Sequence, residues 1–554
     1  MWTSILGKLK EIWTKMLGSK TIQESLNVAP LISKEMEAAI NLWSSMYINK
    51  APWIKEPDAE DPVRIVSLGL PALIATEKAR MVLLEFQSEI TTPTEEVEVE
   101  NPNYQEPIPD DYGNIIPSSQ PPKITEEKPI GDTVRAEFLN KQYTKLKEKL
   151  RQQLEYGIAK GGLVIKPRIV MNPVLGESDE ETNETTATIE FDFIQADNFF
   201  PIAFDANGNI TEAAFVQAIQ DKTTIYSRLE YHKFKGNSVQ IINKAYKSTD
   251  TSVKSSMNRT LNLGKEIPLS DVPQWKDLQE KTTVKNVMKP LFAYFKMPDA
   301  NTIDTTSPLG VSGYSRVTDL IKDADMQYSR LLWEYEAGEM AIDIDRDAIK
   351  FQEGENGQGG HSIRPYLQNR LFRKIDISST GDTYQPYAPT LRDAQYIQGL
   401  NTILMRIEDV CGISRGTLSD AAAEARTATE LKILKQRSYC SNAEIQHALE
   451  NALKDVIYVM NVYCDLYEIT PDGDYDTSFE WDDSILVDVE TELNKKIVLM
   501  QNGLMSKLEV REWYFGETER QAQEALLKIE NETMQNMENE LVMQENAQKE
   551  ELQK

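Results

Sequence analysis

The sequence predicts a mainly α-helical fold with α+β parts. Two amphipathic helical patterns, within residues 307–340 and 388–411, flank a strand-rich insert at residues 341–387, and an unusually long helical pattern follows. A helix that leads into a series of strands occupies residues 131–306. Because 554 residues are too many for one hydrophobic core, we expect two or more domains.

The composition favours a soluble globular protein and limits its partners. With a formal net charge of −28, tight nonspecific binding to nucleic acid is not expected, because such binding depends on an excess of Lys and Arg. The same charge would suit a surface that DNA passes without sticking, since like charges repel. The cysteines Cys411, Cys440 and Cys464 form no CxxC pair, which favours a reducing compartment over a disulfide scaffold or a zinc site.

Residues 1–130 are predicted to form an N-terminal helical region. Within it, residues 91–129 are an acidic, proline-rich and solvated excursion. The start of the chain is amphipathic, with Trp2 and Trp13 on its apolar face. We favour an arm that packs on the protein itself or on a neighbouring subunit over docking at a membrane surface. No run is long and apolar enough to span a bilayer, so stable membrane insertion is not expected.

The α+β region opens with a helix that starts near residue 131 and ends at Gly161 and Gly162, a common helix end. Strand-like runs follow it, and Asn207 with Gly208 signals a hairpin between two of them. The predicted strands cover residues 163–171, 186–194, 213–219, 224–234 and 239–247.

The two patterns that flank the insert place apolar residues at three- and four-residue spacings, as one face of a helix does. The residues that we expect to pack between these helices are Val317, Leu320, Ala324, Tyr328, Leu331, Ile397 and Leu404. The third helix opens at Thr427, whose spacing to Glu430 is that of a capping box. This helix and a following strand cover residues 427–488, and further helices cover residues 489–554.

No motif points to catalysis, a cofactor or a metal ion. The sequence has no GxxxxGK phosphate loop, no GxSxG elbow and no HExxH pair. Cys411 could be a nucleophile, but a buried thiol is the favoured interpretation. Asp472, Asp474 and Asp483 could hold magnesium in a nuclease, although a solvated turn fits them better because they lack the spacing of a calcium loop. We therefore do not expect an enzyme.

Five segments of the sequence resemble tailed-phage portal proteins. They are PLFAYF at residues 290–295, SPLGVS at residues 307–312, CGISRGTLS at residues 411–419, TATE at residues 427–430 and NGLMS at residues 502–506. The resemblance covers most of residues 131–516 and is greatest for the portals of long-tailed phages and prophages of Gram-positive bacteria.

The resemblance implies a portal-type fold and a dodecameric ring at one vertex of the capsid. The implied regions are a wing (131–306 and part of 427–488), a stem (307–340 and 388–411), a clip (341–387), a tunnel loop (412–426) and a crown side (489–554). The implied partners are further copies of the chain, double-stranded DNA in the channel, the terminase large subunit, the head-tail adaptor, and the major capsid and scaffolding proteins. The implied location is the virion, after assembly in the bacterial cytoplasm, and no cofactor is implied.

The residues that we expect to contact DNA from the tunnel loop are Arg415, Thr417, Ser419 and Arg426. For the two arginines, ordinary salt bridges are the alternative. The basic residues that we expect to dock an acidic partner or DNA from the clip are Arg364, Arg370, Arg373 and Lys374. The alternative for this cluster is a solvated strand face. Two other functions remain open: another ring or minor capsid protein of virus assembly and, least favoured, the metal-dependent nuclease.

Overall fold

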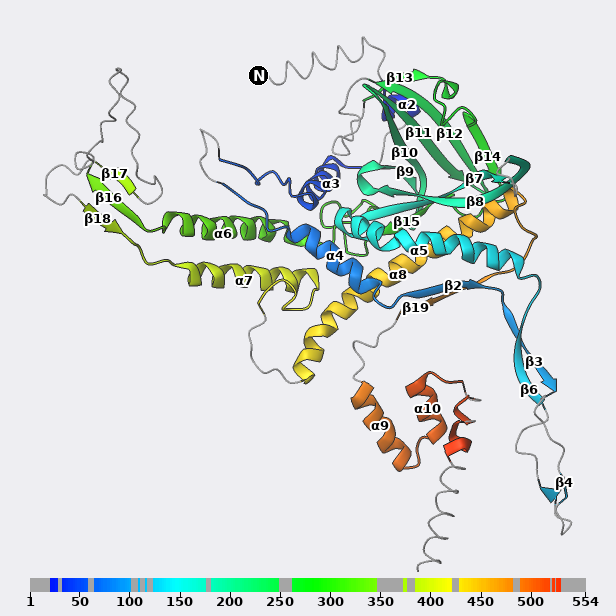
Figure 1. Cartoon of the computed structure of the whole chain (residues 1–554). Helices are drawn as coiled ribbons and strands as arrows, with labels where there is room; N and C mark the ends of the chain where they lie inside the picture. Colours follow the sequence, from blue (N-terminus) through cyan, green and yellow to red (C-terminus); the bar gives the residue numbers. More distant parts are fainter. Residues whose placement is uncertain are drawn as a thin grey trace, which may run out of the picture. The chain divides into compact units, whose positions relative to one another are not determined.

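The structure is a computed structural model that divides the chain into two compact units, Met1–Trp481 and Asp482–Lys554. The residues that it describes are 20–27, 32–57, 64–100, 108–109, 115–116, 123–175, 181–248, 262–345, 372–375, 384–420, 428–481, 489–518, 521–523 and 525–529. Figure 1 shows their helices and strands. None of the helices in this part of the chain has the length and apolar character that spanning a membrane requires.

Four helices pack together in the larger unit. They are α3 (Lys34–Tyr47), α4 (Leu70–Val82), α5 (Val134–Lys160) and α8 (Ala428–Leu466). α5 buries an apolar face at helical spacing and ends where Gly161 adopts a left-handed φ of 91°. α8 has 39 residues, so it is about 58 Å long. The helices predicted after residues 131 and 427 are confirmed, while the capping role of Thr427 lies outside the described residues.

Antiparallel sheets follow α5 and cover the predicted strands. One sheet is formed by β15 (Ala293–Lys296), β7 (Gly162–Leu175) and β8 (Glu181–Gln195). The larger sheet has the order β1 (Lys20–Thr21), β13 (Asn262–Ile267), β12 (Ser238–Ser248), β11 (Thr224–Lys235), β10 (Ile210–Asp221) and β9 (Phe199–Phe204), with β14 (Lys281–Lys285) also on β12. The predicted turn at Asn207 and Gly208 is present, but it joins β10 to β9, a strand that was not predicted from the sequence.

Short helices connect these elements. They are α2 (Ile22–Leu26), η1 (Ala196–Asn198), η3 (Leu269–Asp271) and η4 (Ser315–Val317).

A helix pair carries the insert. α6 (Thr318–Ala337) and α7 (Asp393–Cys411) lie side by side (Figure 1). The insert between them contains β16 (Ala341–Asp345), β17 (Phe372–Ile375) and β18 (Tyr384–Tyr387). β16 lies in the middle, parallel to β17 and antiparallel to β18. The predicted order of helix, strand-rich insert and helix is therefore confirmed.

The start of α6 and the end of α7 share one hydrophobic core with the four helices and with β7. Tyr314, just before α6, is completely buried, and its hydroxyl donates to the carbonyl of Trp43 in α3 at 2.8 Å. A smaller cluster joins β12 and β14 to α8 through Val239, Val284 and Val459. The helix pair is therefore rooted in the same core that supports the sheets.

The excursion at residues 91–129 is more ordered than the sequence predicts. β2 (Gln87–Thr91) pairs with β19 (Asp476–Glu480), and β3 (Thr94–Glu100) pairs with β6 (Lys123–Pro129) as an antiparallel ribbon. β4 (Ile108–Pro109) and β5 (Ile115–Ile116) form a further short pair. The alternation of Glu with Val97 and Val99 is a strand pattern, and acidic content hid it.

The smaller unit contains α9 (Val489–Gln501) and α10 (Lys507–Phe515). α10 opens with a capping box, in which the Ser506 hydroxyl accepts from the amide of Glu509 at 3.1 Å and the Glu509 carboxylate accepts from the amide of Ser506 at 2.6 Å. It ends at Gly516, which has a φ of 63°. The prediction that helices resume at Val489 is confirmed.

Candidate functional site

The loop after α7 turns back along the helix that precedes it. α7 ends at Gly412, whose φ of 68° is a left-handed conformation that a Cβ atom disfavours. The following residues, 412–420, are called the return loop here. At its far end, the amide of Asp420 donates to Asn401 Oδ1 at 2.8 Å. Because Asn401 lies ten residues before the end of α7, the return loop retraces about 15 Å of the helix.

Glu408 holds the return loop against α7. Its side chain is completely buried, and Oε1 accepts from the amides of Leu418 and Ser419 at 2.6 and 2.9 Å. Oε2 accepts from the Ser419 hydroxyl at 2.7 Å. Glu408 and Asn401 of α7 thus accept from the amides of three consecutive residues, Leu418, Ser419 and Asp420. We call these two side chains and their bonds to the return loop the α7 clamp.

Two other polar residues of the return loop are also engaged within the chain. Arg415 is exposed and forms a two-pronged ion pair with Asp409, with nitrogen–oxygen distances of 3.0 and 2.7 Å. The hydroxyl of exposed Thr417 donates to the carbonyl of Ser414 at 2.7 Å. The return loop is thus a defined structure with Arg415 on its outer surface.

The other end of the helix pair is held by Glu334 of α6. Its carboxylate accepts from the backbone amide of Arg392 at 3.1 Å and from the guanidinium at 3.1 and 2.8 Å. A carboxylate therefore acts at each end of the pair: Glu334 of α6 holds the start of α7 beside the insert, and Glu408 of α7 holds the return loop.

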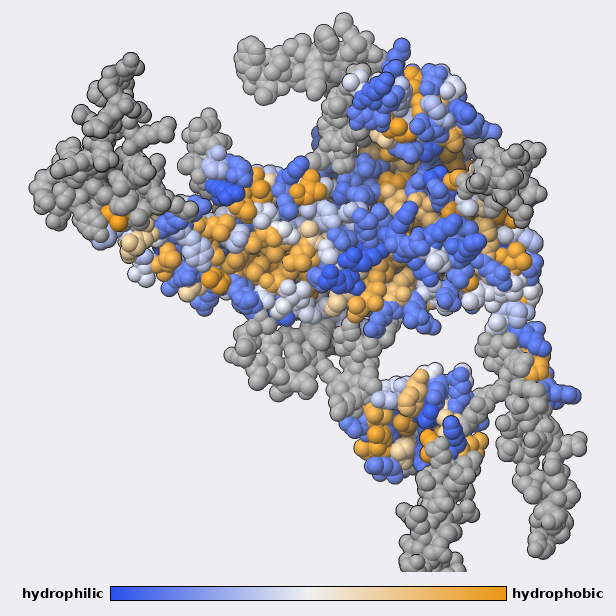
Figure 2. All heavy atoms as spheres, viewed as in Figure 1, coloured by the Kyte–Doolittle hydropathy of each residue, from blue (hydrophilic) through white to orange (hydrophobic). Residues whose placement is uncertain are grey.

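The predicted packing residues divide into three groups by exposure. Val317, Ala324 and Leu331 are buried, and Leu320, Tyr328 and Leu404 are half-buried. Ile397 is 42% exposed, so it packs little within a single chain. Large apolar side chains also remain exposed along or beside the pair, and Figure 2 shows apolar surface in this region. They are Trp333, Tyr335, Met340, Tyr387, Leu391 and Ile397.

Cys411 lies where α4, α7 and α8 meet. The Nζ atom of Lys78 in α4 donates to Ser441 Oγ in α8 at 3.2 Å, beside the Cys411 thiol. Burial raises the pKa of Cys411 to about 12, against the opposing effect of Lys78. A thiol with such a pKa is neutral at pH 7, which favours the interpretation of Cys411 as a buried structural residue.

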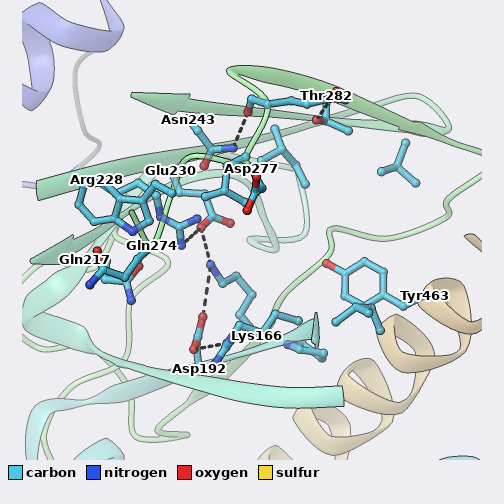
Figure 3. A pocket seen from close by; sticks show the side chains of 18 of the residues that line it. Lys166, Asp192, Gln217, Arg228, Glu230, Asn243, Gln274, Asp277, Thr282 and Tyr463 are labelled. Carbon is cyan, nitrogen blue, oxygen red and sulfur yellow. Dashed lines mark hydrogen bonds and ion pairs between the residues drawn. The ribbon is translucent and has the colours of Figure 1, made fainter. Parts of the chain in front are cut away.

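A cavity of about 690 Å³ lies between β7, the larger sheet and the end of α8 (Figure 3). Its charged centre is Glu230 on β11, whose carboxylate accepts from Lys166 Nζ at 2.6 Å and lies 2.9 Å from the guanidinium of Arg228. His232 Nε2 lies 2.7 Å from the other carboxylate oxygen. Burial opposes ionisation of Glu230, but Lys166 foremost, then His232 and Arg228, hold its pKa well below the usual range. The network is internally compensated, which is typical of a structural role.

This network makes the stability of the larger unit sensitive to acid. Burial lowers the pKa of His232, although Glu230 opposes the shift, so the folded state keeps this imidazole neutral while the unfolded state binds a proton below about pH 6.5. We expect the free energy of unfolding to fall by up to about 1.4 kcal/mol per pH unit below pH 6.5. Urea unfolding at pH 7.5, 6.5 and 5.5 measures the slope. His232→Gln should flatten it, and an unchanged slope in that variant would contradict the assignment.

Comparison with known proteins gives the chain a family. Residues 143–538 match a family model described as phage portal protein, SPP1 Gp6-like. The chain belongs to the phage portal protein family. No curated protein matches the sequence. The resemblance to portal proteins is therefore confirmed, while the assignment to phages of Gram-positive bacteria stays a prediction.

The predicted tunnel-loop residues of this portal protein have different surroundings. Arg415 forms a salt bridge with Asp409, which is the alternative considered for it. Ser419 is buried and its hydroxyl is bound to Glu408, which leaves it badly placed to touch DNA in this conformation. Thr417 is exposed, and Arg426 lies outside the described residues. Contact with DNA stays a prediction for these positions.

The structure places the other candidates only in part. Arg373 and Lys374 lie in β17, but the structure does not describe their side chains. Arg364 and Arg370 lie outside the described residues. Asp472 and Asp474 are exposed in the turn before β19, and Asp483 also lies outside the description. Within the described ranges, no three His, Cys, Asp or Glu side chains are grouped to hold a metal ion.

Sequence reasoning missed the two residues of the α7 clamp. Glu408 stands four residues after Leu404 and three before Cys411, so it occupies a position on the apolar face of the predicted helix. Asn401 lies seven residues before Glu408, on the same side. A carboxylate at an apolar-face position was the signal, because such a group remains buried only if donors surround it.

Proposed function

We propose that this portal protein closes into a ring of twelve copies at one capsid vertex, through which double-stranded DNA is packaged and ejected. The observation that carries the proposal is the apolar surface left exposed along α6 and α7, where Trp333 is 62% exposed. Contiguous exposed apolar surface marks protein interfaces. A subunit with two different, complementary faces forms a ring when the rotation closes. Membership of the portal family supports the same assembly.

In this proposal, the regions of the portal fold follow the boundaries expected from the sequence. They are a wing (131–306 with part of 427–488), a stem (307–340 and 388–411), a clip (341–387), a tunnel loop (412–426) and a crown side (489–554). The clip docks the terminase large subunit during packaging and the head-tail adaptor afterwards, and capsid and scaffolding proteins surround the ring. The protein assembles in the host cytoplasm, remains in the virion and catalyses no reaction itself.

The outer face of α7 supports a channel that DNA passes without sticking. Its exposed polar residues are Gln395, Gln398, Thr402 and Arg406, and no carboxylate of α7 is fully exposed. Amide and hydroxyl groups neither repel phosphate nor bind it strongly, and one arginine per subunit offers only a transient contact. A net charge of −28 makes a helix face without exposed acid a distinct feature.

Electron microscopy of the purified protein, with rotational averaging, tests the ring directly. We expect closed rings with a channel wide enough for duplex DNA. Trp333→Asp should reduce assembly at least about tenfold in sedimentation measurements, because a charge replaces a large interface side chain. Met288→Asp is the matched control, since Met288 is 69% exposed but lies outside the helix pair. A wild-type protein that stays monomeric or dimeric at every salt concentration would refute the proposal.

A further inference from the structure

The α7 clamp contains a buried carboxylate whose described hydrogen bonds all come from neutral donors. Glu408 is completely buried, and its three described bonds come from two amides and one hydroxyl. A carboxylate is costly to bury unless donors satisfy it, whereas a packed apolar side chain has no such cost. The residue is therefore suited to a role that packing alone does not fill.

That role is to hold the backbone of the return loop in place against α7. The amides of Leu418, Ser419 and Asp420 are consecutive, and two side chains on one side of α7 accept from all three. Each carboxylate bond is charge-assisted and roughly twice as strong as a neutral hydrogen bond. The Ser419 hydroxyl also accepts from the amide of Gly416 at 3.3 Å, so the clamp extends into the turn of the loop.

We propose that Glu408 is a positioning residue of the DNA channel: its carboxylate fixes the return loop against α7 and so sets the point, beside Asn401, from which the chain continues towards α8. This inference rests on the proposed portal function. It divides the predicted tunnel loop into residues 412–420, which belong to the stem, and residues 421–426. Arg415 is held to Asp409 on the adjoining part of α7, so it moves with the stem.

Hydrogen–deuterium exchange of assembled rings tests the clamp itself. Glu408→Ala removes all three acceptor contacts, and we expect the amides of residues 418–420 to exchange at least about tenfold faster, while residues 394–405 of α7 keep their protection. Glu408→Gln retains one oxygen for the two amides and should restore most of the protection. Glu450→Ala is the matched control, because it removes a carboxylate that accepts from Trp481 and Lys454, away from the return loop.

The number of DNA-filled heads distinguishes a positioning role from a purely structural one, because a purely structural residue would not change it once rings have formed. Particles assembled with Glu408→Ala should contain normal rings but at least tenfold fewer filled heads, and Glu408→Gln should recover them. Unchanged exchange at residues 418–420, or faster exchange with normal packaging, would overturn the proposal. If Glu408→Ala fails to form rings, Ser419→Ala decides, since it removes one of the three contacts and should give a smaller rise in exchange. Absence of rings in the wild-type protein would instead refute the portal assembly.

Discussion

Replacing Glu230 by Gln is expected to destabilise the larger unit by about 3–5 kcal/mol, because removing one partner of a buried charge network leaves the others uncompensated. Gln has nearly the same shape, so packing around β11 stays the same. Lys166 would nevertheless keep only the more distant carboxylate of Asp192, at 3.8 Å, and Arg228 would lose the carboxylate that faces it. Both cations are largely withdrawn from water, which makes this loss larger than that of a surface ion pair.

The midpoint of urea unfolding measures this effect, provided that the slope with denaturant is unchanged. Glu190→Gln is the control on the neighbouring strand β8. Glu190 pairs with Arg168, and both side chains are about half exposed, so we expect a loss below about 1 kcal/mol. Equal effects of the two substitutions would contradict the assignment of Glu230 as the centre of the network.

Replacing Gly310 by Ala is expected to destabilise the attachment of the helix pair by about 3 kcal/mol, at the upper end of overpacking effects. A Cβ atom at this position would overlap the carbonyl oxygen of Gly161 and lie 2.9 Å from the amide nitrogen of Met297. Both obstacles are backbone atoms, so no flexible side chain can move aside. The same contact joins the end of α5 to the segment that leads into α6.

Gly399→Ala in α7 is the matched control. Its added Cβ would meet only the flexible end of Gln327, and Ala in a helix is favoured over Gly by about 0.5–1 kcal/mol. Thermal unfolding of the two variants should therefore move in opposite directions. Unchanged stability of Gly310→Ala would show that the two backbones can separate at little cost.

Local patterns were sufficient to predict much of the fold. α5 and α6 follow from apolar residues at helical spacing, because each helix buries one continuous face. The strands β10, β11 and β12 follow from alternating residues and turn signals, which depend only on neighbours in the sequence. The order of these elements does not by itself indicate a function, and it was the family resemblance that linked this order to a portal-type fold.

Long-range contacts explain what the sequence did not reveal. The partner of β2 is β19, nearly four hundred residues away, and no local pattern identifies such a pairing. The role of Ser419 depends on a carboxylate eleven residues earlier, on a helix whose end must first reverse the chain. Trp333 is not among the predicted packing residues, and the spacing of apolar residues along a helix does not reveal which of them stay exposed in the folded chain.

The way in which the insert leaves and rejoins the helix pair has a consequence for evolution. β16 and β18 pair directly, with Ala341 opposite Tyr387, so the chain departs and returns at neighbouring points. Glu334 and Arg392 fasten the two helices just before this junction. Segments of other lengths and sequences can therefore be exchanged beyond the junction without altering how the helices meet. A lineage of such proteins can thus exchange the insert by recombination while inheriting the helix pair unchanged.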